Sequence, residues 1–429
     1  MWDSQDPVGC FQNLNSLRIS GFTSLKYLFP ASVVKGLKQL KDLSISCCGV
    51  EEIVANENGV EAVPMFEFPS LTSLSLWGLG QLKRFYREKY TLSCPLLKKL
   101  YVGCCDKVEL LFQEKCLEGE LDEQPLFLIE KSTFPNVEEL MLSFTGPMEI
   151  WRGQFSRESF GKLRVLEIKV CEGIPVAIPC SKLPVLQNLE QLNVKDCNSV
   201  EEVIQEEGLA GETIPRLTKI CLKRLPSLMH LSGLQPILQN LHSLEVVDCG
   251  NLMNLVSPSM AKRLVQLKEL SITYCSMVKE IVGADVSEAT DDISFTNLEK
   301  LRLGNLVVLE SFSSASNTFK FPSLTYIWIT DCPQMEYFCM GHSMTPRLEK
   351  MYMNGRSLHL ENDLNTIIRN YFTEWVLNDQ HPKVEDSQEE VPDEEDAEEG
   401  DSEEQHPKVE SSVEEDTEGE NSEGGSGSP

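Results

Sequence analysis

Residues 163–171 read LRVLEIKVC, and residues 189–197, 241–249 and 267–275 read LEQLNVKDC, LHSLEVVDC and LKELSITYC. They share the pattern L-x-x-L-x-[ILV], with Cys eight residues after the first position. The pattern, with conservative replacements, recurs thirteen times, with first positions 14, 40, 71, 97, 137, 163, 189, 217, 241, 267, 298, 324 and 348. The spacing runs from 24 to 40 residues and is most often 26. Such regular recurrence predicts an array of structural repeats.

The order of residues within each repeat predicts a short strand. Apolar residues at the fourth and sixth positions share one face of a strand, because successive side chains point to opposite faces. A single strand with its return segment cannot close a core, whereas stacked neighbours bury a continuous aliphatic spine. We therefore expect a solenoid whose parallel strands lie side by side.

The recurring cysteines are interpreted as core residues. Seven repeats carry Cys at the ninth position, where the strand bends into the return: Cys48, Cys105, Cys171, Cys197, Cys249, Cys275 and Cys332. A small side chain there can sit inside and bond a neighbouring backbone group. Adjacent thiols such as Cys104 and Cys105 lack the spacing of zinc ligands. We expect no metal and no cofactor.

Composition limits the remaining possibilities. The chain has 429 residues, 41% of them hydrophobic, and a formal net charge of -29, which argues against a molecule-wide basic surface for nucleic acid. No apolar run is long enough for a membrane span, and the first residues lack the pattern of a signal peptide. The fifteen cysteines include no C-x-x-C pair, and the chain has no N-x-S/T sequon. This usage favours a reducing compartment, so we predict a cytoplasmic protein.

The charge is concentrated at the C-terminus. Residues 379–429 hold 21 Asp and Glu against two Lys, a net charge of -19, and almost no large apolar residues. A segment of this composition cannot bury enough surface to offset its ordering entropy. The predicted organisation is a repeat solenoid over 1–362, a capping helix over 363–377 and a disordered acidic tail over 378–429.

The two ends of the solenoid differ. Apolar residues after Asn362 and Asp363 follow helical spacing and predict the capping helix: Leu364, Ile367, Ile368, Tyr371, Phe372 and Trp375. At the other end the first repeat begins within fifteen residues of Met1 without a polar cap. We expect that end to be covered by a partner or to continue in a longer protein.

Several runs resemble the C-terminal leucine-rich repeats of plant coiled-coil nucleotide-binding (CC-NBS-LRR) disease-resistance proteins. They include FQNLNSLRISGFTSLKYLFPASVVKGLKQLKDLSISCCGVEEIVANE, FPSLTSLSLWGLGQLKRFY, FPSLTYIWITDCPQMEYFCMG and the closing LENDLNTIIRNYF. The resemblance covers residues 1 to about 377. It implies an α/β solenoid, a leucine-rich repeat horseshoe of about 13 repeats with a concave parallel β-sheet. The chain contains no G-x-x-x-x-G-K-[ST] phosphate loop, so we expect it to lack the nucleotide-binding module of those receptors.

In this fold the third, fifth and seventh positions of each repeat face the concave side. They hold nine basic residues: Arg18, Lys99, Lys169, Lys195, Lys219, Lys223, Lys300, Arg302 and Lys350. They hold five acidic residues: Asp42, Glu139, Glu167, Glu245 and Glu269. The inner face thus carries +4. Aromatic side chains on it are Trp77, Tyr101, Tyr326, Trp328 and Tyr352.

Aromatic and Arg side chains are enriched among residues that anchor protein complexes. The candidate protein-binding residues are therefore Arg18, Trp77, Lys99, Tyr101, Lys219, Lys223, Lys300, Arg302, Tyr326, Trp328 and Tyr352. The alternative is an ordinary solvated sheet face. One interpretation of the acidic tail is that it screens this basic face until a partner displaces it, and the simpler one is a solubilising tail.

The chain contains neither H-E-x-x-H nor G-x-S-x-G, and we predict that it is not an enzyme. Two function classes follow. The first is a recognition or autoinhibition module in plant defence that binds a pathogen effector, a guarded host protein or a nucleotide-binding module. The second is a stand-alone leucine-rich repeat scaffold, such as a substrate adaptor of a ubiquitin ligase. Protein partners are expected in both, with no nucleic acid.

Overall fold

A computed structural model describes residues 11–55, 65–108, 111–114, 126–129, 133–144, 151, 160–205, 216–235, 237–283, 292–360 and 363–378. The chain divides into two units, Met1–Leu377 and Asn378–Pro429. Residues 379–429 lie outside the described residues, so the disorder of the acidic tail stays a prediction.

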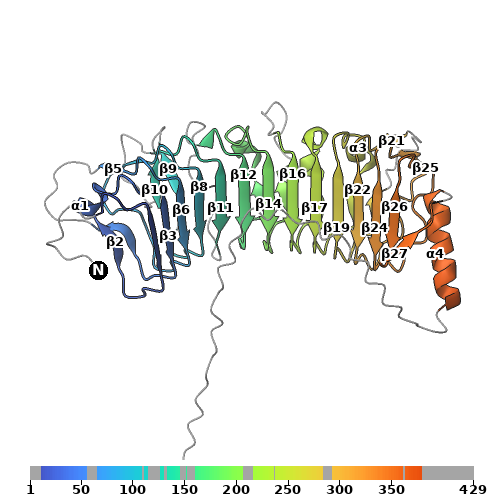
Figure 1. Ribbon diagram of the computed structural model, residues 1–429, viewed down its shortest axis with the longest axis horizontal. Helices are drawn as coiled ribbons and strands as arrows, with labels where there is room; N and C mark the ends of the chain where they lie inside the picture. The colour runs from blue at the N-terminus through green and yellow to red at the C-terminus, as the bar shows by residue number, and fades with distance from the viewer. Residues whose placement is uncertain are drawn as a thin grey trace, which may run out of the picture. The chain divides into compact units, whose positions relative to one another are not determined.

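The first unit is a solenoid built on one long sheet (Figure 1). In the described part of the chain, thirteen of its strands are parallel and follow one another in the order of the sequence. They are β1 (Ser16–Ser20), β3 (Asp42–Ser46), β6 (Ser73–Trp77), β8 (Lys99–Gly103), β11 (Glu139–Ser143), β12 (Val165–Lys169), β14 (Gln191–Lys195), β16 (Lys219–Lys223), β17 (Ser243–Val247), β19 (Glu269–Thr273), β22 (Lys300–Gly304), β24 (Tyr326–Thr330) and β26 (Lys350–Met353). Each strand begins two residues after a first position of the repeat pattern, which confirms the predicted repeats.

The register brings equivalent residues of successive repeats opposite one another. For example, Leu166 lies opposite Leu192, and Ile168 lies opposite Val194. These fourth and sixth positions are buried, as are first positions such as Leu40. The aliphatic spine therefore runs along the solenoid, although Leu14 in the first repeat is only partly buried against it.

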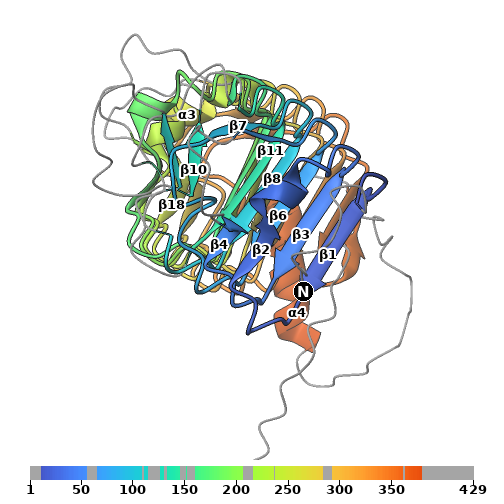
Figure 2. The same ribbon diagram turned by 90° about the vertical axis from the view of Figure 1, so that its left-hand side faces the viewer.

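The return segments lie across the core from the long sheet, as the end-on view in Figure 2 shows. They pair in small parallel sheets: β2 (Tyr27–Pro30) with β4 (Glu52–Ala55), β5 (Met65–Glu67) with β7 (Thr91–Ser93), β9 (Phe112–Glu114) with β10 (Phe127–Ile129), β13 (Val176–Ile178) with β15 (Glu202–Ile204), β18 (Asn254–Val256) with β20 (Glu280–Val282), and β21 (Ile293–Ser294), β23 (Phe319–Lys320) and β25 (Ser343–Met344) together. Helical segments of the described returns include α1 (Ala31–Val34), α3 (Pro258–Ala261) and the 3-10 turns Cys180–Lys182, Ser232–Leu234 and Leu238–Asn240.

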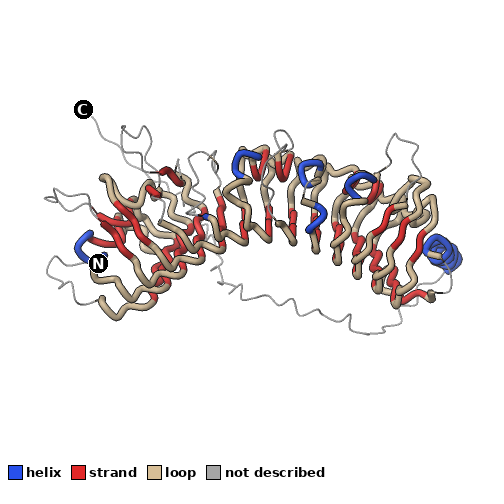
Figure 3. Tube along the Cα trace, turned by 90° about the horizontal axis from the view of Figure 1, so that it is seen from above, coloured by secondary structure: helices blue, strands red, loops and turns tan. Residues whose placement is uncertain are grey.

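The helical share of the described returns is thus smaller than the term α/β implies. Return sequences such as YLFP in β2 and EIVA in β4 are rich in aromatic and β-branched residues, which favour strands. The curved form of this unit agrees with the prediction, because the long sheet follows the concave side (Figure 3).

The seven cysteines at the ninth position are all buried. The Cys197 thiol donates to the carbonyl of Lys195 at 3.1 Å and to that of Ile168, one repeat earlier, at 3.8 Å. The backbone N–H of Cys171 in turn donates to Cys197 Sγ at 3.4 Å. Their interpretation as small core residues that bond the backbone is confirmed.

The residue just before this cysteine slot has a left-handed backbone in most repeats. Non-glycine residues with positive φ there are Cys47, Cys104, Val170, Asp196, Arg224, Asp248, Tyr274, Asn305 and Asp331, and Asn354 has the same conformation near the end of the last repeat. Val170, with φ of 51°, is the one β-branched member of this set and is the most strained.

The C-terminal end of the solenoid is closed by β27 (Arg356–Leu358), antiparallel to β26, and by α4 (Leu364–Asn378). Asp363 Oδ1 accepts from the backbone N–H groups of Asn365 and Thr366 at the start of α4. Asn365 Oδ1 accepts from the N–H groups of Phe338 and Cys339, and its Nδ2 donates to the Cys339 carbonyl. The buried face of α4 includes Leu364, Ile367, Ile368 and Tyr371.

Candidate protein-binding surface

The predicted site residues lie on the concave face of the long sheet, which is the face turned away from the core. Burial alternates along its strands: in β24 the side chains of Ile327 and Ile329 are buried, whereas those of Tyr326 and Trp328 are half-buried and Thr330 is exposed. All eleven candidate residues lie at the outward positions of this alternation. The structure therefore places them on one face, distributed from β1 to β26.

Trp77 packs closely against a glycine of the neighbouring strand. Trp77 in β6 is opposite Gly103 in β8, and a Cβ atom built on Gly103 would stand 2.3 Å from the indole ring. Only glycine allows this contact, since any side chain at position 103 would displace the ring. The nearby Tyr101 hydroxyl donates to Glu139 Oε2 at 3.0 Å.

Four of the nine basic residues on this face are engaged in ion pairs with acidic residues of the same face. The pairs are Lys99 with Glu139, Lys195 with Glu167, Lys223 with Glu245, and Lys300 with Glu269, at N···O distances of 3.0 to 3.3 Å. We call these eight residues the paired band. Its charges are compensated internally, which reduces what they can offer to a ligand.

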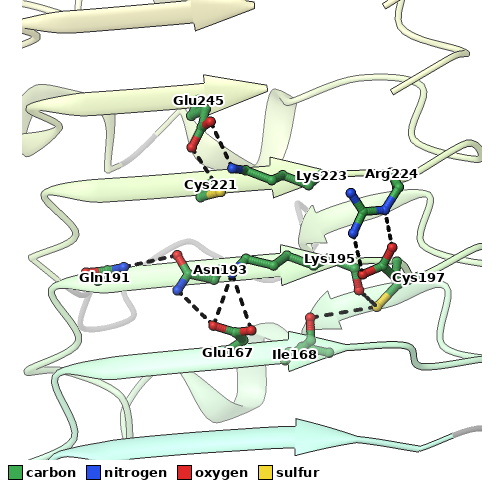
Figure 4. A network of polar contacts seen from close by, with 11 residues as sticks. Glu167, Ile168, Gln191, Asn193, Lys195, Cys197, Cys221, Lys223, Arg224 and Glu245 are labelled. Atoms are coloured by element: carbon green, nitrogen blue, oxygen red, sulfur yellow. Dashed lines mark hydrogen bonds and ion pairs between the residues drawn. The ribbon is translucent and has the colours of Figure 1, made fainter. Parts of the chain in front are cut away.

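The middle of the paired band is a hydrogen-bonded network (Figure 4). Gln191 Nε2 donates to Asn193 Oδ1, and Asn193 Nδ2 donates to Glu167 Oε2, each at 3.2 Å. Lys195 Nζ lies within 3.4 Å of both oxygens of Glu167. The polar groups of neighbouring strands therefore satisfy one another.

Glu245 in β17 is a half-buried acceptor of the paired band, and its pKa is shifted. Burial alone would raise its pKa, but hydrogen bonds from Lys223 and Cys221 and the charges of Lys223 and Lys219 lower it below the usual value. Burial, followed by the charge of Glu245, raises the pKa of the Cys221 thiol to about 12. Cys221 is thus a neutral hydrogen-bond donor and not a nucleophile at physiological pH.

A rim pair adjoins this network at the strand ends. Arg224 binds Asp196 through two nitrogens, one of them at 2.8 Å from Oδ2. The hydrogen bond from Arg224 is the main reason that the pKa of Asp196 lies below its usual value. Both residues have the left-handed backbone and occupy the same position in adjacent repeats.

The C-terminal strands present a different surface. The rings of Tyr326 and Trp328 stack at a centroid distance of 5.4 Å and an angle of 17°, and those of Trp328 and Tyr352 at 6.1 Å and 9°. Arg302 lies opposite Trp328 in the register, and Lys350 lies opposite Tyr326. We call these five residues, Arg302, Tyr326, Trp328, Lys350 and Tyr352, the aromatic patch.

The basic residues outside the ion pairs are Arg18, Lys169, Lys219, Arg302 and Lys350. Within the described ranges none of them has an acidic partner within 4.0 Å. Lys169 and Lys219 still lie close enough to Asp196 and Glu245, respectively, to lower their pKa values. Arg302 and Lys350 flank three aromatic rings, in strands whose outward third, fifth and seventh positions, from β22 to β26, hold no acid.

Sequence reasoning missed one apolar feature of the returns. Met229, Met253 and Met277 lie in three successive repeats with about half of each side chain exposed: 52%, 58% and 47%. The repeat pattern assigns return positions no fixed orientation, so only the coordinates identify these side chains as exposed. The described residues contain no group of three His, Cys, Asp or Glu that could hold a metal ion.

Comparisons with known proteins identify the family. A family model described as plant disease resistance protein RPS2-like, leucine-rich repeats, matches residues 1–122, 136–276 and 234–353. A probable disease resistance protein of Arabidopsis thaliana is 32% identical over 129 residues, which make up 28% of this chain and 14% of that protein. This match therefore spans a small part of that relative.

Among solved structures, a chain of the mouse RP105/MD-1 complex is similar over 80% of this chain and 52% of its own length, with a TM-score of 0.26 and 13% identity. The fold assignment rests instead on the strand order and the family match. No helix among the described residues is long and apolar enough to cross a membrane. Because the family matches extend over most of the solenoid, the chain belongs to the leucine-rich repeats of RPS2-like plant disease resistance proteins.

Proposed function

We propose that this chain is a non-catalytic protein-recognition module of plant defence, and that a protein partner docks on its concave sheet face. The partner would be a pathogen effector, a guarded host protein or a nucleotide-binding switch module that the repeats hold inactive. Leucine-rich repeat solenoids are binding scaffolds of this kind, and membership of a resistance-protein family supports the defence context.

The observation that carries the proposal is the aromatic patch. Three half-buried rings stand together on the sheet with two cations, Arg302 and Lys350, for which the described ranges supply no ion pair. Aromatic and Arg side chains of this type dominate the energetics of protein interfaces. The Trp77 and Tyr101 region supports a second contact on the same face, near the other end of the solenoid.

The cysteines support a cytoplasmic location, which we include in the proposal. All thirteen cysteines in the described part of the chain are free thiols, including the exposed Cys47. Free thiols persist in the reducing cytosol and are rare in secreted proteins. Residence in the cytoplasm would place the concave face where effectors and host signalling proteins meet.

The test is complementation in a plant that lacks the gene. Plants carrying the unmodified chain, a Trp328→Ala chain or a Met253→Ala chain at equal protein level would be challenged with a pathogen that the unmodified chain helps to resist. We expect the Trp328→Ala chain to fail and the Met253→Ala chain to succeed. Full complementation by Trp328→Ala would contradict docking at this face, and an absence of any defence phenotype would contradict the role in defence.

A further inference from the structure

The geometry points to the chemistry of the segment that docks on the aromatic patch: an extended acidic peptide with an apolar residue midway between two acids. This inference rests on the proposed docking at the concave face and goes beyond it by specifying the ligand. It follows from three properties of the patch, namely its free charge, the orientation of its rings and its spacing.

The charge favours an acidic ligand. Lys300 at the edge of the patch is already paired with Glu269, whereas Arg302 and Lys350 have no ion pair among the described residues. The outward third, fifth and seventh positions of β22, β24 and β26 contribute no carboxylate. A carboxylate that binds Arg302 or Lys350 therefore displaces no partner that the described part of the chain supplies.

The rings supply an apolar contact for the ligand. The ring of Trp328 is close to parallel with those of Tyr326 and Tyr352, so the three half-buried rings form one contiguous aromatic surface. A Phe or Leu side chain can pack on such a surface. The midpoint of the ligand is therefore expected to be apolar.

The spacing favours an extended segment. Arg302 in β22 and Lys350 in β26 lie on either side of β24. Their partners in β24, Trp328 and Tyr326, are two residues apart, so the two cations are offset by two residues along the strand direction. Strand spacing of ~4.8 Å and a rise of ~3.3 Å per residue then put their Cα atoms roughly 12 Å apart. In an extended peptide, residues i and i+4 share one face and lie ~13 Å apart, with residue i+2 between them on the same face. The matching pattern is acid-x-apolar-x-acid.

The probe is the fluorescein-labelled peptide Gly-Asp-Ser-Phe-Ser-Asp-Gly, titrated with the full chain at low salt and followed by anisotropy. Three comparison probes are a peptide of the same composition with the two Asp adjacent, one with Asn for Asp, and one with Ser for Phe. A single-stranded oligonucleotide of similar length tests the nucleic-acid alternative. We expect each comparison peptide to bind about tenfold more weakly.

Charge-reversal variants locate the site. Arg302→Glu and Lys350→Glu should each weaken binding of the probe about tenfold or more. Their matched controls are Arg263→Glu, at an exposed return position, and Lys169→Glu, at an outward position of β12, and both lie away from the aromatic patch. Each control should change affinity by less than about twofold, because charge at that distance is screened by salt.

Equal losses from the controls, or equal affinity for the peptide with adjacent acids, would overturn the inference. Tighter binding of the oligonucleotide would do so as well. Trp328→Ala, with its fold checked by circular dichroism, must also lose the preference for Phe over Ser. Because the binding assay involves no plant phenotype, its failure would leave the complementation result, and so the proposed function, intact.

Discussion

The paired band and the aromatic patch occupy equivalent strand positions of one sheet, but their charged residues are in opposite situations. In the paired band, Glu245 accepts from Lys223 and Cys221, and Glu167 accepts from Lys195 and Asn193. In the aromatic patch, Arg302 and Lys350 flank stacked rings and have no acid beside them in the register. The comparison teaches that the same repeat position can serve the sheet itself or remain available to a ligand.

The net charge of the face conceals this difference. Nine basic and five acidic residues give +4, and after four ion pairs the five remaining cations and Asp42 also give +4. What changes is where the free charge lies. A partner that approaches the sheet closely therefore encounters paired charges in the middle of the concave face and unpaired cations beside aromatic rings at its C-terminal end.

The largest expected change in the free energy of unfolding comes from the core that the paired band and the aromatic patch share. Leu244 lies under the paired band and Leu301 lies under the aromatic patch, and both are at most 1% exposed. Leu244→Ala and Leu301→Ala should each lower the free energy of unfolding by about 2–5 kcal/mol, because each leaves a cavity in the spine. Urea unfolding would measure this. A small effect at Leu301 beside a large one at Leu244 would mean that the patch lacks a packed base.

Removing a charged side chain should have a smaller effect on the free energy of unfolding, and the effect should differ between the paired band and the aromatic patch. Glu245→Ala leaves Lys223 and Cys221 without their acceptor in a half-buried site, so it should lower the free energy of unfolding by about 1.5 kcal/mol. Arg302→Ala removes a side chain that forms no ion pair within the described ranges, and it should lower the free energy of unfolding by less than about 0.5 kcal/mol. If Arg302→Ala were the more destabilising of the two in the same urea experiment, the assignment of structural and available charges would be reversed.

A substitution at the strand ends should stabilise the paired band. Val170, after β12, holds a left-handed backbone with a β-branched side chain, whereas Asn305 and Asn354 occupy this conformation beside the aromatic patch. Asn tolerates it better than Val. Val170→Asn should therefore raise the free energy of unfolding by about 1 kcal/mol, measured by urea unfolding. The reverse change, Asn305→Val, is the control and should destabilise by a similar amount.

The sequence predicts the frame of both regions but not this division. The Leu, Ile and Val positions locate all thirteen strands, and the cysteine slot follows from the bend after each strand. Whether Lys223 reaches Glu245 depends on the register of β16 and β17 and on side-chain rotamers, which no single repeat encodes. Trp77 and Gly103 are 26 positions apart in the sequence, so their contact likewise could not be predicted before the register of β6 and β8 was known.

The repeat pattern did not predict two further features, the left-handed residues at the strand ends and the short strands of the returns. The left-handed residue at the strand end is usually marked by glycine or Asn, but Val170, Arg224 and Tyr274 adopt it because the parallel strands on both sides fix the turn. The left-handed residues thus show tertiary packing overriding local preference. The short return strands instead follow local preference, because sequences such as YLFP and EIVA are rich in aromatic and β-branched residues, and the described returns therefore hold less helix than the term α/β implies.

The smallest effect concerns pH and again contrasts the two regions. The pKa of Glu245 is lower in the folded protein than its ordinary value of 4.5. A depressed carboxyl pKa contributes stability that is fully present above the unfolded pKa, and this contribution is lost as the pH falls through the folded pKa. Between about pH 5 and pH 3 the unmodified chain should therefore lose more stability than the Glu245→Gln variant.

Arg302→Gln is the control for that measurement. It removes a group that stays protonated over the whole range, so the pH dependence of unfolding should match that of the unmodified chain. Thermal unfolding followed by circular dichroism at several pH values would compare the three proteins. Identical curves for the unmodified chain and Glu245→Gln would mean that the Lys223 and Cys221 contacts do not hold this carboxylate ionised. The paired band would then owe its order to packing alone, and the contrast with the aromatic patch would reduce to shape.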